Sequence, residues 1–375
     1  MTTKAVICAF KRSPFTQASK GALAKVRPDD MAATVIRALV DETRVNVDDI
    51  EDLLMGCAFP EAEQGFNIAR IVANIADLPL SVAGATLNRF CGSSMTTIHQ
   101  AAAYIMAGAG DVYIAAGVES MTRIPMGGFN PMPNPALVSR FPAAYMSMGE
   151  TAENLARKYM ISRAEQESFA LESQRRASAA AASGKFDIEI TPVAGVNADG
   201  CIRPDTTAEG LAALKPAFDL NGSVTAGTSS PLTDGASAVL VTSEDYARAH
   251  NLPVLARIKS FAAAGCAPDI MGIGPVPATH KALARAGLSM KDIELVELNE
   301  AFAAQSLSVL KELPFDPSIV NIDGGAIALG HPLGASGARI TGKLASLLVR
   351  EGKKYGLATM CIGGGQGVAI VLERI

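Results

Sequence analysis

The sequence predicts an α/β protein built from two similar halves, with a long segment inserted into the first half. Three observations lead to this fold class. Short apolar runs alternate with alanine-rich stretches along much of the 375-residue chain, which is typical of sheets covered by helices. A short segment of the first half is repeated late in the chain. Between residues 120 and 232 the alternation gives way to a different composition.

In and around the first half, four short apolar runs are predicted to be buried strands: residues 4–9, 52–55, 111–116 and 236–242. Three longer, alanine-containing stretches are predicted to be helices: residues 29–44, 93–108 and 150–159. Thr151 is the expected cap of the third helix, because a threonine side chain at a helix start can accept a backbone hydrogen bond.

The repeated segment predicts two related halves. Residues 49–59 match residues 292–302 at a constant offset of 243 residues, with aspartate, isoleucine, glutamate, alanine and phenylalanine coinciding. In both copies a predicted helix precedes the segment, and a glycine-containing loop and a helix follow it. Chance similarity between two short strands is the alternative, but the shared order of elements favours duplication of one α/β unit.

The segment between the halves has the character of an insertion. Residues 121–135 are dense in Met, Pro, Gly and Asn without a sustained period, residues 194–204 are also loop-like, and a long helix is predicted over 163–183. Long insertions in enzymes often form lids or binding walls. The predicted division is a first half, an inserted loop domain and a second half: residues 1–120 plus 233–254, residues 121–232 and residues 255–375.

The composition excludes several functional classes. Hydrophobic residues make up 49% and charged residues 19%, as in compact globular enzymes. A formal net charge of −4 provides no general attraction to nucleic acid or anionic membranes. The N-terminal residues lack a signal-peptide pattern and no apolar run approaches membrane-spanning length, so the expected location is cytoplasmic. The six cysteines include no C-x-x-C pair, which favours reduced thiols over a disulfide framework or a zinc site.

Cys91 is the first candidate for chemistry. It lies in Asn88-Arg89-Phe90-Cys91-Gly92-Ser93-Ser94, directly before the helix predicted over 93–108. The helix dipole and the free backbone N–H groups at such a position lower the pKa of a thiol from its ordinary value of about 8.5. A small buried hydrophobic residue is the alternative. The polar, glycine-bearing surroundings favour a functional thiol.

A histidine and a second cysteine lie near the C-terminus. His331, one of four histidines, sits in Gly330-His331-Pro332-Leu333-Gly334 and can act as a base or as a donor to an oxyanion. Cys361 ends the strand predicted over 356–360 and opens a glycine run whose amides can approach a ligand closely. Cys91, His331 and Cys361 are each expected at a glycine-flanked strand end. This suggests thiol chemistry in which one sulfur attacks and the other moves a proton.

Asn299 is the fourth candidate. In Asn299-Glu300-Ala301-Phe302, after the strand predicted over 295–298, it can hold a water or orient the histidine, and a strand-end cap is the alternative. The other histidines are expected to be structural, because they lie in helical or surface-like stretches: His99, His250 and His280.

Taken together, these segments resemble the thiolase superfamily along essentially the whole chain. The resemblance is carried by Asn88-Arg89-Phe90-Cys91, Asn299-Glu300-Ala301-Phe302, Gly330-His331-Pro332 and Cys361-Ile362-Gly363-Gly364-Gly365. Residues 56–65, 124–128 and 148–153 further resemble the degradative 3-ketoacyl-CoA thiolases. The resemblance implies a five-layered αβαβα core of two similar halves, with a loop domain inserted in the first.

The resemblance also implies a role for each candidate. Cys91 would be the acylated nucleophile, His331 would activate it, and Cys361 would be the acid/base toward acetyl-CoA. Asn299 would position a water that forms one oxyanion hole with His331. The backbone N–H groups of Cys91 and Gly363 would form the other.

Five further residues match family positions around the substrate. Met148, Met271 and Phe302 match residues that line the acyl or pantetheine pocket, and ordinary core packing is their alternative. Arg203 and Ser230 match residues that contact CoA, Arg203 being the candidate for a phosphate contact. A solvated loop arginine is its alternative. Coenzyme A is implied as a co-substrate, with no metal and no permanently bound cofactor.

The implied reaction is the CoA-dependent cleavage of 3-ketoacyl-CoA through an acyl-cysteine, with ping-pong kinetics. Three residues depart from the family pattern. Ser94 and Pro231 each replace a glycine, and Ser147 stands where short-chain biosynthetic thiolases carry a histidine. Ser147 and Pro231 weaken the alternative of an acetyl-CoA acetyltransferase that condenses two acetyl-CoA.

Other classes fit less well. A ketoacyl synthase is disfavoured by Cys361 in its glycine loop, and a non-catalytic acyl-CoA-binding protein by the presence of all four reactive residues. The resemblance implies a homodimer or homotetramer, and some relatives join a hydratase/dehydrogenase subunit. Acyl-chain length and physiological direction stay open.

Overall fold

The computed structural model describes residues 3–375. Its strands are β1 (Ala5–Arg12), β2 (Thr16–Gln17), β3 (Asp52–Gly56), β4 (Ala83–Leu87), β5 (Val112–Ser120), β6 (Thr233–Ser243), β7 (Ala256–Gly265), β8 (Leu295–Leu298), β9 (Tyr355–Ile362) and β10 (Gln366–Glu373). Its α-helices are α1 (Pro28–Thr43), α2 (Ile68–Ile75), α3 (Ser93–Met106), α4 (Pro135–Arg140), α5 (Met148–Lys158), α6 (Arg163–Ala182), α7 (Ala208–Ala212), α8 (Glu244–Ala249), α9 (Pro275–Ala286), α10 (Ala303–Glu312), α11 (Ala326–Leu329) and α12 (Leu333–Arg350).

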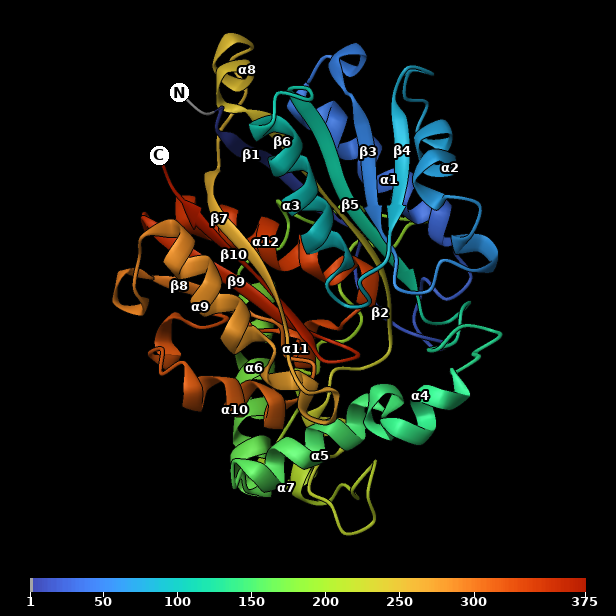
Figure 1. The fold of residues 1–375 in the computed structure, drawn as a ribbon, viewed down its shortest axis with the longest axis vertical. Helices are drawn as coiled ribbons and strands as arrows, with labels where there is room; N and C mark the ends of the chain where they lie inside the picture. The colour runs from blue at the N-terminus through green and yellow to red at the C-terminus, as the bar shows by residue number, and fades with distance from the viewer. Residues whose placement is uncertain (1–2) are drawn as a thin grey trace.

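The strands form two sets joined at one edge (Figure 1). The first set runs in the order β4-β3-β5-β6-β1 and the second in the order β7-β10-β9-β8, with β2 paired to β6. Two residue pairs between β1 and β7, Val6 with Arg257 and Ile7 with Ala256, connect the sets.

The two sets share one topology. The pairs β3–β5 and β8–β9 are parallel, whereas β5–β6 and β9–β10 are antiparallel, as are β6–β1 and β10–β7. Even the edge strand β4 has a counterpart, since Val320 forms a parallel bridge to Val296 of β8. β3 begins at Asp52 and β8 at Leu295, so the repeated segment occupies the same place in both halves.

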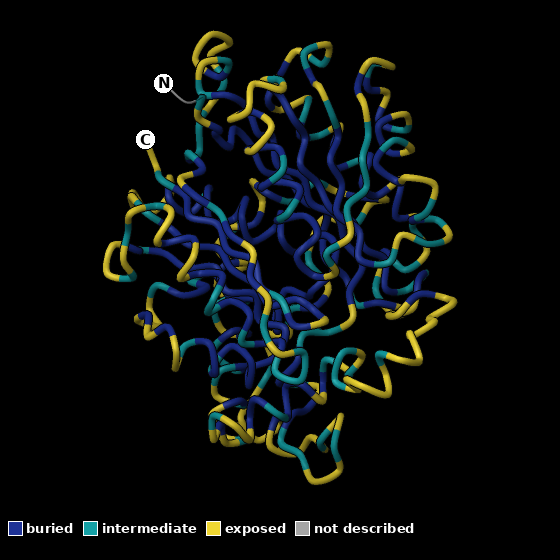
Figure 2. Tube along the Cα trace, in the orientation of Figure 1, coloured by how far each residue is buried: buried dark blue, intermediate teal, exposed yellow. Residues whose placement is uncertain are grey.

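The helices and the two strand sets make five layers. Helices α1 and α2 pack on the outer face of the first set, and α9 and α10 cover the outer face of the second. Helices α3 and α12 lie between the sets and contact each other and strands of both. Figure 2 shows the buried chain running through the middle of the molecule, with exposed segments around it. This is the predicted αβαβα arrangement.

Most predicted elements are present, and three strands, β1, β5 and β6, are longer than expected because buried polar residues extend them. The strand predicted over residues 4–9 begins at Ala5 and continues to Arg12, whose side chain is fully buried. The cap predicted for the helix over 150–159 is wrong. α5 begins at Met148 and is capped by Ser147, which forms a capping box with Glu150. Thr151 lies inside the helix and donates to the carbonyl of Met148.

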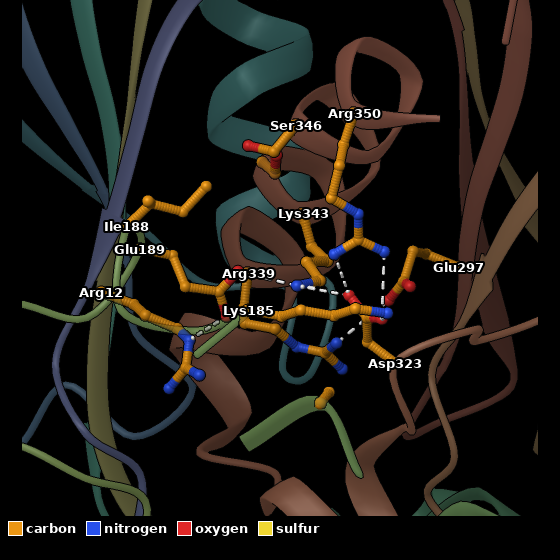
Figure 3. A network of polar contacts seen from close by, with 12 residues as sticks. Arg12, Lys185, Ile188, Glu189, Glu297, Asp323, Arg339, Lys343, Ser346 and Arg350 are labelled. Carbon is orange, nitrogen blue, oxygen red and sulfur yellow. Dashed lines mark hydrogen bonds and ion pairs between the residues drawn. The ribbon is translucent and has the colours of Figure 1, made fainter. Parts of the chain in front are cut away.

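The inserted segment leaves the first strand set after β5 and returns at β6, carrying α4 to α7 (Figure 1). Its long helix α6 packs on α10 and α11 of the second half. Buried charged groups also attach it to the core: Glu189 pairs with Arg12 of β1 and with Lys343 of α12 (Figure 3). Within residues 3–375, no helix combines the length and apolarity needed to cross a bilayer.

Candidate active site

Cys91 lies in a tight turn that leads from β4 into α3. Phe90, directly before it, has a φ of 43°, a left-handed conformation that is uncommon for a bulky residue and costs about 1–3 kcal/mol. The hydroxyl of Ser93 holds the turn, because it donates to the Phe90 carbonyl at 2.6 Å and accepts the Arg89 N–H at 2.8 Å. The turn fixes the Cys91 side chain at the start of the central helix.

The pKa of Cys91 differs from the sequence prediction. Burial raises it to about 11, although hydrogen bonds from the backbone N–H groups of Gly363 and of Cys91 itself act to lower it. The N–H groups lower the pKa, as expected at the start of a helix, but burial of the thiol away from water raises it by more. The prediction of a lowered pKa is wrong, so the resting thiol is protonated and needs a base.

Cys361 lies inside β9 rather than after its end, and the glycine turn joins β9 to β10. Gly364 and Gly365 have φ of 79° and 84°, and a Cβ on Gly365 would meet the Cys266 carbonyl oxygen at 2.4 Å. The turn therefore needs glycine. Burial raises the pKa of the Cys361 thiol well above its ordinary value, and the nearby Cys91 raises it further. Both sulfurs are therefore protonated at rest.

His331 sits in the loop between α11 and α12, not at a strand end as predicted. Its backbone N–H donates to Thr233 Oγ1 at 3.0 Å, its Nδ1 lies 2.5 Å from Ser336 Oγ, and its Nε2 lies 3.3 Å from Asn299 Nδ2. Burial and then the charge of Arg339 lower the pKa of the imidazole to about 3. The resting histidine is neutral, which a proton acceptor requires.

Asn299 follows β8 and faces the same central space as His331. Its side chain is completely buried, and Asn299 Oδ1 has no hydrogen-bond partner among residues 3–375. A buried amide oxygen without a partner is costly in a folded protein. This oxygen is therefore suited to accept a bond from a water or from a substrate group.

Residues that the sequence reasoning missed hold the start of α12 in place. Glu119, at the end of β5, accepts the N–H groups of Gly334 at 2.9 Å and Ala58 at 2.8 Å. Ser94, one of the departures from the family pattern, accepts the N–H of Ala338 at 2.8 Å. Glu119 could have been noticed in the sequence, because it is the only acidic residue in the otherwise apolar run of β5. The sequence carried no comparable signal for Ser94 or for Ser336.

The three apolar candidates lie together. Met271, Phe302 and Cys361 belong to one buried cluster, and Met148 packs against it. A Cβ on Gly363 would lie 3.4 Å from the Met148 sulfur, so this methionine also borders the glycine turn. These side chains form an apolar wall beside the Cys361 thiol.

The two candidates for CoA contact are not members of this cluster, although Ser230 is hydrogen-bonded to Ala301, which is a member. Arg203 is exposed, and its backbone N–H donates to Gln174 Oε1 of α6. Ser230 is half-buried, and both its N–H and its hydroxyl donate to the carbonyl of Ala301, at 3.0 and 3.1 Å. Ser230 thus fixes the inserted segment to the Asn299 loop, whereas Arg203 has a free guanidinium group among the described residues.

The other histidines lie elsewhere. His99 is buried in α3 and stacks on Phe261, and His250 stacks on Tyr246 beyond the exposed end of α8. His280 is exposed on α9. The candidate site therefore contains the buried thiols of Cys91 and Cys361, the neutral imidazole of His331, and backbone N–H groups that act to lower the pKa of Cys91. This set can form and resolve a thioester.

Comparisons with known proteins agree with this chemistry. The family model described as thiolase, N-terminal domain, matches residues 5–245, and that described as thiolase, C-terminal domain, matches residues 252–374. A 3-ketoacyl-CoA thiolase of Shewanella frigidimarina is 49% identical, covering 99% of this chain and 100% of the relative. One of Bacillus subtilis is 46% identical, covering 99% of each. The crystal structure of human mitochondrial 3-ketoacyl-CoA thiolase in complex with CoA superimposes with a TM-score of 0.92 at 39% identity, covering 100% of this chain and 98% of that one.

Proposed function

The chain belongs to the thiolase family, and we propose that it cleaves 3-ketoacyl-CoA with free CoA to give acetyl-CoA and an acyl-CoA shortened by two carbons. It is an acyltransferase. Two pairings of buried reactive groups support the proposal: His331 Nε2 lies 3.3 Å from Asn299 Nδ2, and Cys91 is close enough to Cys361 to raise the pKa of its thiol.

The first half-reaction begins with the neutral His331. Its Nε2 takes the proton of the Cys91 thiol while the sulfur attacks the 3-keto carbon. The bond between carbons 2 and 3 then breaks, and its electron pair leaves on the acetyl-CoA fragment. Cys361 gives its thiol proton to that carbanion, so acetyl-CoA departs and the shortened acyl group remains as a thioester on Cys91.

The second half-reaction reverses these roles. The thiol of an incoming CoA gives its proton to the Cys361 thiolate and attacks the acyl carbon. Cys91 leaves as the thiolate and recovers the proton from His331. Both thiols and the imidazole return to their resting states, and the order of substrates makes the kinetics ping-pong.

Two groups of donors would stabilise the negative oxygen in these steps. The N–H groups of Cys91 and Gly363 act to lower the pKa of the Cys91 thiol, and this favourable effect on a negative charge supports their assignment to one oxyanion hole. His331, once protonated on Nε2, and a water held by Asn299 would form the other. The unpartnered Asn299 Oδ1 supports that assignment.

Coenzyme A would enter along the inserted segment. Met148, Met271 and Phe302 would line the pantetheine or acyl pocket, because they border Cys361 and the glycine turn. Arg203 would meet a phosphate of CoA with its exposed guanidinium group. Ser230 would contact CoA through its hydroxyl oxygen, which keeps its acceptor capacity while it donates to Ala301.

The proposed domains are residues 1–120 plus 233–254, residues 121–232 and residues 255–375. The change of strand set between β1 and β7 supports the boundary near residue 255, and the excursion between β5 and β6 supports the inserted domain.

The assembly would be a homodimer or a homotetramer. β4 ends the first strand set, and its outer side has no strand partner among residues 3–375. Phe66 and Leu80, close to it in the chain, are 93% and 84% exposed. An open strand edge beside exposed apolar side chains supports pairing with a second copy. A hydratase/dehydrogenase subunit would be a further partner.

The test is CoA-dependent cleavage of 3-ketoacyl-CoA substrates from four carbons upward. Cys91→Ala should abolish turnover, whereas Cys8→Ala, which removes a buried thiol from the outer face of the first strand set, should retain it. Turnover restricted to acetoacetyl-CoA would replace the proposal with an acetyl-CoA acetyltransferase. Binding of CoA thioesters without turnover would replace it with a binding protein.

A further inference from the structure

We propose that Ser336 is a positioning residue that holds His331 in the tautomer with its proton on Nδ1. The inference rests on the proposed role of His331 as the base for Cys91, and it concerns a residue to which neither the family motifs nor the reaction assigns a task. Ser336 lies in the first turns of α12 and is completely buried.

The geometry links four polar groups in a line. Asn299 Nδ2 lies 3.3 Å from His331 Nε2, and His331 Nδ1 lies 2.5 Å from Ser336 Oγ. Ser336 Oγ lies 3.1 Å from the carbonyl oxygen of Pro332. His331 is only 4% exposed, so bulk water does not compete for either ring nitrogen.

The two ends of this line fix the direction of its hydrogen bonds. An amide nitrogen can only donate, and a carbonyl oxygen can only accept. Asn299 therefore donates to Nε2, which must carry a lone pair, and the ring proton of the neutral imidazole must sit on Nδ1. Nδ1–H donates to Ser336 Oγ, and the Ser336 hydroxyl donates its own hydrogen bond to the Pro332 carbonyl oxygen. Each hydrogen bond of the line then has one donor and one acceptor.

This tautomer is the one that the reaction needs. A lone pair on Nε2 can take the Cys91 proton, whereas an Nε2–H cannot. After that transfer, the Ser336 oxygen still accepts Nδ1–H and stabilises the buried imidazolium, whose charge burial disfavours. Ser336 would therefore act on proton transfer and leave substrate binding unchanged.

Helix geometry explains the position of Ser336. It lies four residues after Pro332, so its hydroxyl reaches the Pro332 carbonyl one turn back. Ser346, on the same helix, makes the same kind of bond to the Gly342 carbonyl at 3.1 Å. No hydrogen bond joins the Ser346 side chain to a histidine among the described residues, so it provides a matched control.

The experiment compares Ser336→Ala, Ser336→Thr and Ser346→Ala with the unaltered enzyme. Magic-angle-spinning ¹⁵N spectra of histidine-labelled protein report the tautomer of His331, whose signals are assigned by their loss in His331→Asn. The unaltered protein and Ser346→Ala should show Nδ1–H. Ser336→Ala should show Nε2–H or a mixture, with kcat lowered about 100-fold and KM within about twofold, the lower end of a general-base contribution. Ser336→Thr, which restores the hydroxyl, should recover most of kcat.

Two results would overturn the inference. An Nε2–H signal in the unaltered resting enzyme would mean that the ring proton is not on Nδ1 and that the proposed direction of the hydrogen bonds is wrong. If Ser336→Ala and Ser346→Ala showed the same His331 tautomer and the same kcat, Ser336 would have a structural role and would not position the histidine. The spectra of the unaltered enzyme decide the tautomer even if Ser336→Ala does not fold, and even if the enzyme shows no cleavage activity. Failure of the proposed function, measured as cleavage activity, can therefore be distinguished from failure of this inference, measured as the tautomer of His331.

Discussion

The backbone N–H groups of Gly363 and of Cys91 itself act to lower the pKa of the Cys91 thiol. That pKa nevertheless lies above the ordinary value because the side chain is buried. His331 is shifted in the opposite direction for the same reason, since burial disfavours the charged form of each group. The resting pair is therefore a thiol and a neutral imidazole. In the proposed reaction His331 takes the thiol proton as the sulfur attacks, so the negative charge passes to the substrate oxygen, where hydrogen-bond donors can stabilise it.

The alkylation rate of Cys91 in substrate-free enzyme should expose this state. With a pKa raised to about 11, the thiolate fraction should rise about tenfold per pH unit between pH 7 and pH 9, without a plateau. The measurement is the rate of iodoacetamide labelling of the Cys91 peptide by mass spectrometry. Cys91→Ala, which removes the labelled site, is the control. A plateau below pH 8 would instead reveal a resting thiolate–imidazolium pair.

At the residue scale, the sequence predicted the identities of the reacting groups but not their protonation. Cys91, His331, Asn299 and Cys361 were chosen from motifs, and the structure buries all four and brings Asn299 into contact with His331. Their pKa values depend on how much chain covers them, which a local pattern does not contain. Ser336 was missed because its task exists only once α12 places it beside His331.

Helices α3 and α12 approach the first strand set so closely that glycine is required at several contacts. A Cβ on Gly117 of β5 would lie 2.1 Å from the Gly334 carbonyl oxygen and 2.6 Å from Ser94 Cβ. A Cβ on Gly56 of β3 would lie 2.4 Å from the Ser94 backbone nitrogen. Since backbone atoms block these positions, no side-chain rotation can relieve the contact. The glycines therefore set the depth at which the helix carrying Cys91 and the helix following His331 are seated.

Gly117→Ala should consequently lower both stability and activity. Overpacking of this kind costs about 3 kcal/mol, and pushing Gly334 outward would displace His331 from Cys91. Urea unfolding and kcat measure the two effects. Gly200→Ala is the control, because its added Cβ would meet Thr16 at an ordinary 3.4 Å. Equal stability and kcat in the two variants would show that α12 is not held at this contact.

At the element scale, the strands and helices that were predicted in the first half lie within a few residues of the observed ones, except at ends set by tertiary contacts, whereas α2 and β4 were not predicted. The apolar period identified β3 and β5, but β5 continues through Glu119 because that carboxylate is satisfied by the N–H groups of Ala58 and Gly334. The cap of α5 was missed because Ser147 and Thr151 both suit a cap. The reciprocal bond with Glu150 selects Ser147.

At the scale of the whole molecule, the duplicated topology was predictable because the offset of 243 residues appears in the sequence itself. The attachment of the inserted domain was not, because it depends on charges far apart in the chain. Asp323 of the second half meets Lys343 of α12 at 2.9 Å, Arg350 at 2.6 Å and Lys185 of the insertion at 3.3 Å (Figure 3). Its side chain is 1% exposed. One buried carboxylate thus joins the insertion to the central helix.

The pH dependence of stability should follow from this carboxylate. Burial alone would raise the pKa of Asp323, but the hydrogen bonds and charges of Arg350 and Lys343 overcome it and hold the pKa well below the ordinary value. A depressed carboxyl pKa stabilises the folded state fully above the unfolded value of about 3.9. That contribution is lost as the pH falls further toward the folded pKa. The difference in unfolding free energy between the unaltered enzyme and Asp323→Asn should therefore be constant near neutrality and shrink below about pH 4.

Asp323→Asn should cost about 3 kcal/mol at pH 7, the low end for breaking a buried pair, because Lys343 keeps Glu189 and Arg350 keeps Glu351 as partners. Asp245→Asn is the matched control: its partner Arg248 is as exposed as it is, 76% each, so its loss should cost less than about 1 kcal/mol. Urea unfolding at pH 7 and at a series of lower pH values measures both. Since Asp323 touches no reacting atom, kcat of the folded variant should stay near that of the control. A cost equal to that of Asp245→Asn at pH 7 would mean that Asp323 does not hold the insertion, which would then depend on the ion pairs of Glu189 and on its apolar contacts with α10 and α11.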